Sequence, residues 1–179
     1  MRVLALIIGF LCGLLPLDSA TLQRLSMDQM IDQSTAIVRG RVSSSRAVSR
    51  GPVIYTFSNV QVLESWKGPE RSSVEVAMPG GTAGSLQQSF AGAPKLEPGA
   101  EYVLFLWTGK SGVTYVIGLS QGLFNVRVDA SGNTVVERPA TSAIMLDAKT
   151  GHPVKDQAVQ MPLSSLRERV RTMVGKARQ

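Results

Sequence analysis

The sequence predicts a mainly β protein, an antiparallel barrel or sandwich with a short N-terminal helix and an amphipathic C-terminal helix. Several short segments alternate apolar and polar residues, and turn signals separate them at intervals of about ten residues. Within one long segment the apolar phase shifts by one residue after Ser58–Asn59. A β-bulge produces such a shift and lets one strand bend into two parts of a barrel.

Residues 1–20 are predicted to be a signal peptide, and residues 21–179 a single domain. Arg2 supplies the positive start, and a short apolar run ends before a cleavage site at Ala20. The run is short for a membrane-spanning helix, and an uncleaved anchor is the alternative. The sequence therefore predicts export to the periplasm or the extracellular space. Cys12 is the only cysteine and leaves with the signal, so the exported chain carries no disulfide.

The mature chain is predicted to open with a helix and to continue as a strand. Residues 25–33 favour a short helix, in which Ser26 and Gln29 have the spacing of a capping box. Residues 36–42 then alternate with a period of two, which indicates a strand. Gly40 in the middle of this strand indicates a sharp bend or the close approach of another backbone.

The next part of the chain leads into a long glycine-rich stretch. Residues 43–51 are polar and are expected to be a connection, whereas residues 53–62 and 74–78 alternate as strands. Residues 79–94 contain four glycines and two prolines. A loop of this length in a compact domain is functional or disordered, and this composition favours a loop of defined shape.

Beyond the glycine-rich loop the pattern returns to strands. Residues 102–107 are apolar on both faces, which is typical of a central strand that is covered on each side. Residues 115–117 return from it, and residues 124–128 and 134–137 are expected to form a hairpin. Residues 139–160 have little pattern and are expected to cross the surface as a loop.

The C-terminal helix is predicted at about residues 162–177. Ser165 and Glu168 have capping-box spacing, and one apolar stripe is expected to dock on the barrel: Leu163, Leu166, Val170, Met173 and Val174. The formal net charge of the chain is +6, and basic residues are densest on this helix: Arg167, Arg169, Arg171, Lys176 and Arg178. We interpret them as a solvated face. Peripheral binding to the cell-envelope surface is the alternative.

One motif suggests catalysis. Gly118 to Gly122 matches the pattern around the nucleophilic serine of α/β-hydrolases, with Ser120 as the serine and His152, the only histidine, downstream. The residues after Gly122 alternate as a strand, whereas that motif requires a helix there. A serine hydrolase that uses Ser120 and His152 is therefore kept only as an alternative function.

Other chemistry finds little support in the sequence. With one histidine and no mature cysteine, only carboxylate metal sites remain, and Asp and Glu show no ligand-like cluster. Tyr55, Phe57 and Trp66 accompany Arg39 and Arg41 but occupy apolar-phase positions, so we interpret these aromatic residues as core. We predict no metal, no cofactor, no catalytic residues and no nucleic-acid partner.

The order and spacing of several short motifs resemble those of a group of exported bacterial proteins. The shared motifs lie within residues 25–128: residues 25–42, Trp66-Lys67-Gly68, Pro79-Gly80-Gly81, Gly92-Ala93-Pro94, Leu104-Phe105-Leu106 and Gln121-Gly122. This resemblance implies a small OB-like β-barrel and, as a partner, an exported protein such as a matrixin-like metalloprotease. A more distant similarity is to netrin-like domains, including tissue inhibitors of metalloproteases. Those rely on disulfides that are missing here.

The leading hypothesis is a non-catalytic exported domain that binds a protein, a peptide or an envelope glycan through residues 79–94. Glycines allow close backbone approach, and exposed apolar side chains act as anchors. Six residues are proposed to form the binding surface: Gly80, Gly81, Gly84, Leu86, Phe90 and Pro94. The alternative is that the loop closes the end of the barrel and that Phe90 belongs to the core.

Overall fold

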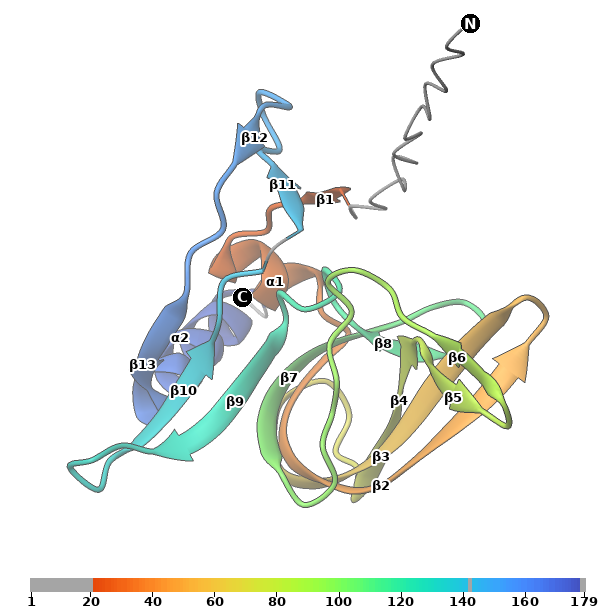
Figure 1. Cartoon of the computed structure of the whole chain (residues 1–179). Coiled ribbons are helices and arrows are strands. Elements are labelled where there is room, and N and C mark those ends of the chain that lie inside the picture. The colour runs from red at the N-terminus through yellow and green to blue at the C-terminus, as the bar shows by residue number, and fades with distance from the viewer. Residues whose placement is uncertain (1–20, 142, 178–179) are drawn as a thin grey trace, which may run out of the picture.

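The computed structural model describes residues 21–141 and 143–177, so the predicted signal peptide lies outside the described residues. The described chain is mainly β, with two helices (Figure 1). The helices are α1 (Met27–Gln33) and α2 (Leu163–Lys176). The strands are β1 (Thr21–Gln23), β2 (Ala36–Arg50), β3 (Val53–Lys67), β4 (Ser73–Pro79), β5 (Gly81–Ala83), β6 (Leu86–Gln88), β7 (Glu101–Thr108), β8 (Thr114–Val116), β9 (Leu123–Val128), β10 (Thr134–Arg138), β11 (Ile144–Leu146), β12 (Pro153–Val154) and β13 (Val159–Pro162).

Eight strands form the main sheet, in the order β13-β10-β9-β7-β2-β3-β4-β8. Neighbouring strands are antiparallel except β4 and β8, which are parallel. One edge of β7 pairs with β2. Its other edge pairs with β9 over Tyr102–Leu104 and with β8 over Leu106–Thr108. The predicted central strand and the predicted hairpin of β9 and β10 are therefore confirmed.

The long strands β2 and β3 pair along nearly their whole lengths, and this corrects one prediction. Residues 43–51 were expected to be a polar connection, but β2 continues to Arg50, and the turn is Gly51-Pro52. The bulge predicted within residues 53–62 lies instead on the partner strand: Ser43 of β2 is an extra residue between the partners of Val60 and Asn59, whereas β3 pairs with β4 over residues 55–61 without a register shift. We call this two-stranded extension, residues 43–50 of β2 with their partners in β3, the arm. Most side chains of residues 43–50 are exposed, so polar residues are tolerated there, and β3 supplies the backbone hydrogen bonds.

Two apolar clusters form the core. The first lies where β2, β3, β4, β7 and β8 curl around a common interior (Figure 1), and its members include Val38, Val60, Val76, Leu104 and Val116. The second packs the other face of β7 and its neighbours against the two helices, and its members include Ile31, Phe105, Phe124, Leu166 and Val170. Alternate residues of β7 therefore enter different clusters, as its apolar pattern on both faces predicts.

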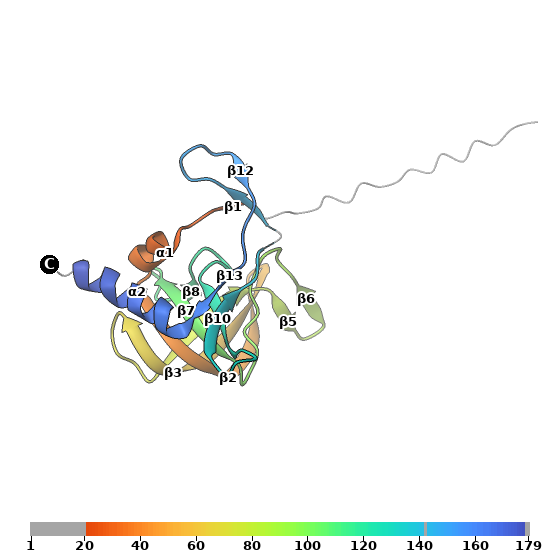
Figure 2. The same cartoon turned by 90° about the vertical axis from the view of Figure 1, so that its left-hand side faces the viewer.

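The two helices lie side by side against the second cluster (Figure 2). The predicted capping box of α1 is confirmed: Ser26 Oγ accepts the Gln29 N–H, and Gln29 Oε1 accepts the Ser26 N–H. The apolar stripe of α2 docks on the sheet as predicted, but its predicted cap is wrong. The helix begins at Leu163, after Pro162, and has no side-chain cap. None of the described helices combines the length and the apolar character that a membrane span requires.

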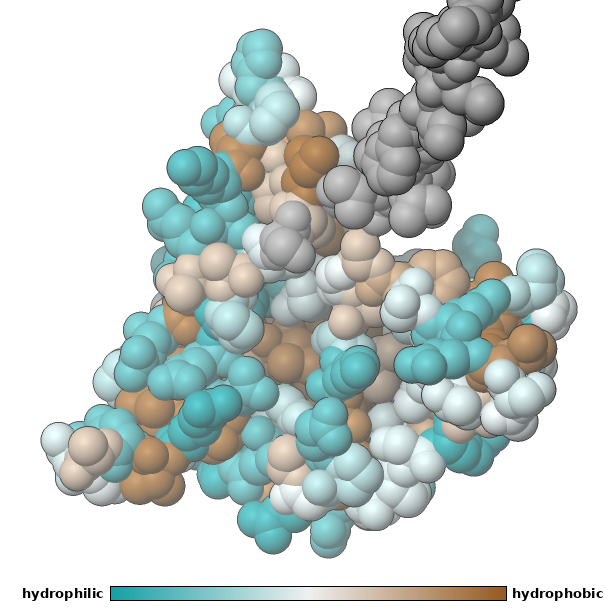
Figure 3. Space-filling view, viewed as in Figure 1, coloured by the Kyte–Doolittle hydropathy of each residue, from teal (hydrophilic) through white to brown (hydrophobic). Residues whose placement is uncertain are grey.

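The predicted loop over residues 139–160 also contains strands. β11 pairs with β1 in parallel and with β12 in antiparallel orientation, which makes a small sheet that projects from the body (Figure 1). Apolar residues gather over β1 and β11 in the space-filling view (Figure 3). These strands have only two or three residues each, too short for an alternating pattern to be recognised.

Candidate functional site

A row of side chains crosses five strands on the outer face of the curled sheet. Strand register pairs Arg46 of β2 with Phe57 of β3, and Phe57 with Ala77 of β4. Ala77 is paired with Tyr115 of β8, which in turn faces Trp107 of β7. Directly opposed residues point to the same face of a sheet. This face is the outer one, because the alternate positions of these strands fill the first core cluster.

The aromatic members of this row differ in exposure. Trp107 is 46% exposed and stacks on Tyr115, with ring centroids 6.4 Å apart and an interplanar angle of 28°. Phe57 is buried, because the guanidinium carbons of Arg46 and Arg50 lie 5.1 and 4.7 Å from its ring centroid. Both distances are within the range of cation–π attraction. The row therefore presents an aromatic surface at one end and a cationic surface at the other.

A groove of about 250 Å³ lies between Tyr55 and Tyr115. The small side chain of Ala77, between their strands, leaves this space open. The other lining residues are apolar: Met78, Pro79, Pro94, Val116 and Leu119. We call the space lined by these eight residues the aromatic groove. Its side-chain hydrogen-bonding groups are two phenols, neither of which is hydrogen-bonded to the described part of the chain.

Leu119 has an unusual backbone conformation at the edge of the aromatic groove. Its φ is 62°, and among the described residues no other non-glycine residue has a positive φ. Leu119 follows Gly118, whose φ is 60°, in a turn closed by a hydrogen bond from the Gln121 N–H to the Gly118 carbonyl. A non-glycine residue in this region costs about 1–3 kcal/mol, and such strain concentrates at functional sites. This backbone conformation places the apolar side chain of Leu119 against the aromatic groove.

The glycine-rich segment is a short hairpin followed by an irregular return. β5 and β6 pair antiparallel, so the prediction of a continuous loop is wrong for these residues. Gly84 occupies the turn with φ 60°. The hairpin packs against the arm of β2 and β3, because a side chain on Gly81 would collide with Thr56 and approach Ala47. The alternation of apolar residues does not predict this hairpin, because its three-residue strands consist mainly of small and polar residues.

Gln88 fastens this hairpin to the arm. Its Oε1 accepts the Ile54 N–H at 2.7 Å, and its Nε2 donates to the Pro52 carbonyl at 2.8 Å. Gly80 is buried, has a φ of 99°, and donates its N–H to the Ile54 carbonyl at 2.7 Å. The hairpin is thus held by backbone groups of Pro52 and of Ile54 in β3, and its tip is left available for contacts.

The two proposed anchors of the segment are exposed. Leu86 is 64% exposed and Phe90 is 41% exposed, so Phe90 is not a buried plug of the core. Pro79 and Pro94, at the two ends of the segment, both line the aromatic groove. The glycine-rich segment and the aromatic groove are therefore neighbours on one surface. That these residues bind a ligand stays a prediction.

The aromatic groove contains residues that the sequence analysis did not select. Tyr55 was interpreted as core but is half-buried and lines the groove, whereas Trp66 is buried as expected. Tyr115 and Trp107 were placed on strands without a functional role. The signal that identifies them is the pairing of β8 with both β4 and β7, which the sequence pattern does not contain.

The structure places Ser120 and His152 in different settings. The Ser120 hydroxyl is buried and has no hydrogen-bond partner among the described residues. His152 lies exposed in the turn between β11 and β12, where its carbonyl accepts the Asp147 N–H. A nucleophile and its base are expected within hydrogen-bond reach, and these two side chains share no hydrogen bond. In the described ranges, 21–141 and 143–177, no group of three potential metal-ligating side chains is found.

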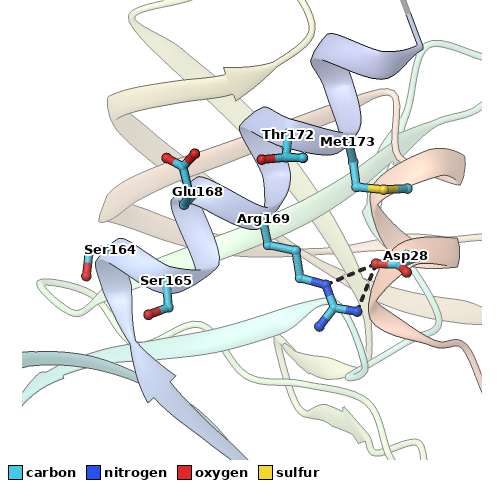
Figure 4. A pocket seen from close by; sticks show the side chains of 7 residues that line it. All are labelled: Asp28, Ser164, Ser165, Glu168, Arg169, Thr172 and Met173. Atoms are coloured by element: carbon cyan, nitrogen blue, oxygen red, sulfur yellow. Dashed lines mark hydrogen bonds and ion pairs between the residues drawn. The ribbon is translucent and has the colours of Figure 1, made fainter.

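Part of the basic surface of α2 is used within the molecule. Arg169 pairs with Asp28 of α1 through its Nε and Nη2, at 3.0 and 2.9 Å, beside a shallow hollow lined mainly by α2 (Figure 4). Arg167 donates from Nη2 to Glu64 of β3 at 2.7 Å. Arg171 and Lys176 are exposed and form no ion pair within the described ranges. Fewer charges are therefore available to an anionic surface than the sequence suggests.

Glu64 joins α2 to the curled sheet and makes the fold sensitive to pH. Burial raises its pKa, but hydrogen bonds from Trp66 and Arg39 and the charges of Arg167 and Arg39 outweigh burial, so its pKa is below the usual 4.5. A lowered folded pKa contributes stability that is present above the unfolded value and lost as pH falls through the folded value. The free energy of unfolding should therefore fall as the pH drops below about 5, through the unfolded pKa and toward the lower folded pKa.

Glu64→Gln provides the control for this pH dependence. Urea unfolding of the wild type and of this variant should be compared from neutral pH down to pH 3. The variant should be less stable at neutral pH and should lose less stability on acidification, because it has no carboxylate to protonate at this position. If the free energy of unfolding fell equally steeply with pH in the two proteins, the pH dependence could not be assigned to Glu64.

No protein-family model matches the chain, and no curated protein matches it.

Proposed function

We propose that the chain is an exported, non-catalytic binding domain built on a small barrel of OB type. The strand pairings support this proposal: β2, β3, β4, β8 and β7 follow one another, β7 pairs again with β2, and β4 and β8 are the one parallel pair of the main sheet. OB-folds are five-stranded barrels that bind ligands over their second and third strands. In this ring those strands are β3 and β4, which carry Tyr55, Ala77 and Pro79 of the aromatic groove.

The row of outward aromatic residues carries the proposal of binding. Exposed aromatic side chains supply a large contact area at low entropic cost, and they dominate the energetics of interfaces. Trp107, Tyr115 and Tyr55 lie on strands of one sheet, and Leu86 and Phe90 project from the neighbouring segment. The surface thus combines a fixed groove with two apolar anchors. The ligand is a protein, a peptide or an envelope glycan in the periplasm or extracellular space, for example part of an exported metalloprotease.

Photo-crosslinking in the producing cell tests this proposal directly. A photoreactive amino acid is placed at position 115, at position 86, or at position 171 on the far helix as the control. We expect crosslinked adducts when the photoreactive residue replaces Tyr115 or Leu86 and none when it replaces Arg171. Mass spectrometry then identifies the bound species. Absence of adducts at both surface positions, or equal adducts at all three, would show that this face is not the binding surface.

Polar replacement of the two anchors should weaken binding without unfolding the domain. Leu86→Ser and Phe90→Ser each remove an exposed apolar side chain, so the thermal midpoint should stay nearly unchanged. Affinity for the crosslinked partner should fall about tenfold for each variant. Titration calorimetry with the purified partner measures the change, and Val128→Ser, which alters another exposed apolar residue, should bind like the wild type. Unchanged affinity in both anchor variants would remove the glycine-rich segment from the interface.

A further inference from the structure

The chemistry of the aromatic groove restricts what it can hold. Six of its eight lining residues are alanine, methionine, proline, valine or leucine, and the other two are tyrosines. A sugar ring carries several hydroxyl groups that need hydrogen-bond partners when water is removed, and unpaired polar groups are costly. The groove offers only the phenols of Tyr55 and Tyr115 for this purpose. The lining therefore favours a mainly apolar ligand over a glycan.

The two phenols suit an extended peptide backbone. Neither hydroxyl is hydrogen-bonded to the described part of the chain, so both are available to donate across the aromatic groove. A polyproline II segment has no internal hydrogen bonds and presents its carbonyls to the surroundings. Its proline rings are apolar, and its fixed conformation lowers the entropy lost on binding, which is why grooves lined by aromatic residues recognise it. Pro79 and Pro94 add rigid apolar walls of matching chemistry.

A cation lies at one end of the row. Arg46 is paired with Glu75 at 2.8 Å, but Arg50, whose guanidinium carbon lies 4.7 Å from the Phe57 ring centroid, has no ion pair within the described ranges. Phe57 in turn packs beside Tyr55, with centroids 6.4 Å apart. A carboxylate would complement this guanidinium, and complementary charge fixes the orientation of a bound chain. The ligand is therefore expected to carry an acidic residue beside its prolines.

We propose that the aromatic groove binds an extended, proline-rich peptide segment with an acidic residue directed toward Arg50. This proposal rests on the proposed function, because it assigns a ligand class to the same surface. Proline rings occupy the space over Ala77, the phenols of Tyr55 and Tyr115 donate to peptide carbonyls, and Leu119 closes the edge. Trp107 extends the contact along the row.

Synthetic peptides test the ligand class with the full mature chain. The probe is an acetylated, amidated peptide of sequence EEPPLPPLPP. One control has alanine at every proline, and a second has lysine for both glutamates. A neutral glucose hexasaccharide is the glycan probe. Binding by fluorescence anisotropy or calorimetry should be strongest for the first peptide, and roughly tenfold weaker or more for each peptide control, because preorganisation or charge complementarity is lost.

Variants of the protein assign the contacts. Tyr115→Phe keeps the ring but removes one hydroxyl, and should weaken binding of the acidic peptide about 3- to 10-fold. Tyr115→Ala should weaken it more than tenfold. Arg50→Gln should abolish the preference for glutamate over lysine, whereas Arg171→Gln on α2 should leave it intact. Circular dichroism and the thermal midpoint establish that each variant is folded.

The outcomes separate this inference from the proposed function. If the hexasaccharide or the alanine peptide binds the wild type and this binding is lost in Tyr115→Ala, the aromatic groove is supported as a binding site. The assignment of a proline-rich peptide as its ligand is then overturned. Failure of every probe to bind the folded wild-type protein would overturn the peptide assignment too. If positions 115 and 86 also give no crosslinks in the cell, the proposed function itself fails. If binding depends on the prolines and on the glutamates and is lost in Tyr115→Ala, both the peptide assignment and the proposed function are supported.

Discussion

Asp156→Ala is expected to lower the free energy of unfolding by about 3–5 kcal/mol, because the substitution leaves the charge of Arg138 buried without a partner. The side chains of Arg138 and Asp156 are only 10% and 2% exposed. Two parallel hydrogen bonds join them, from Nη1 to Oδ2 at 2.8 Å and from Nη2 to Oδ1 at 3.0 Å. Asp156 Oδ2 also accepts the Thr141 N–H at 2.9 Å. The pair thus fastens the segment between β12 and β13 to the end of β10.

The pKa of Asp156 agrees with this role. Burial raises it, but the hydrogen bonds from Arg138 and the Thr141 N–H, together with the charge of Arg138, outweigh burial and bring the pKa below its usual 3.8. The carboxylate is therefore ionised in the folded protein at neutral pH. Its contribution to stability is present above the unfolded pKa and is lost only as pH falls through the lower folded value.

Urea unfolding at neutral pH measures the effect of Asp156→Ala. The matched control is Arg127→Ala on the adjacent strand β9, whose ion pair with Glu137 spans 3.6 Å and has an arginine 66% exposed. An exposed pair of this kind contributes about 0–1 kcal/mol. The double variant Arg138→Met with Asp156→Leu should recover much of the loss, since it buries no charge. A loss below about 1 kcal/mol for Asp156→Ala would show that the pair does not hold this segment.

The sequence was most informative where side-chain pattern and burial coincide. The strand at residues 102–107 was recognisable because both of its faces are apolar, and five of its residues, Tyr102 to Leu106, are fully buried between two clusters. The α1 cap was recognisable because Ser26 and Gln29 interact within one turn. In contrast, residues 43–50 gave no strand signal, because pairing with β3 satisfies the backbone of this arm while its serine and arginine side chains remain in water.

The candidate site was harder to predict because it depends on which strands are neighbours. Alternation shows that Tyr115 and Ala77 lie on one face of their own strands, but no local pattern shows that these strands pair. β4 and β8 meet in parallel at a single pair of residues, and the glycine-rich segment and β7 lie between them in the chain. Leu86 and Phe90 were found because apolar residues stand out in a glycine-rich stretch. Tyr115 and Trp107 were missed because each belongs to an apolar run, residues 115–117 and 102–107, in which no single side chain stands out.

Gly40→Val is expected to destabilise the protein by about 3 kcal/mol or more, at the upper end of the cost of overpacking. A β-carbon at Gly40 would lie 2.5 Å from Val60 Cγ1 and 2.7 Å from the Gln61 carbonyl oxygen. The second contact is with backbone, so it cannot be relieved by rotating a side chain. The close approach that a glycine in mid-strand indicates is therefore confirmed, and it occurs where the register of β2 and β3 shifts.

The cost extends beyond these two contacts, because β2 has a paired strand on each edge at Gly40. Near Gly40 the strand pairs with β3 on one edge and with β7 on the other, so a displacement of its backbone disturbs both ladders and the cluster around Val60. Gly175→Ala on α2 is the matched control, because a β-carbon there meets nothing within 4 Å and alanine favours a helix by about 0.5–1 kcal/mol. Urea unfolding should show a large loss for the first variant and none for the second. If Gly40→Val were as stable as the wild type, β2 and β3 could not approach each other at Gly40 as closely as their register there requires.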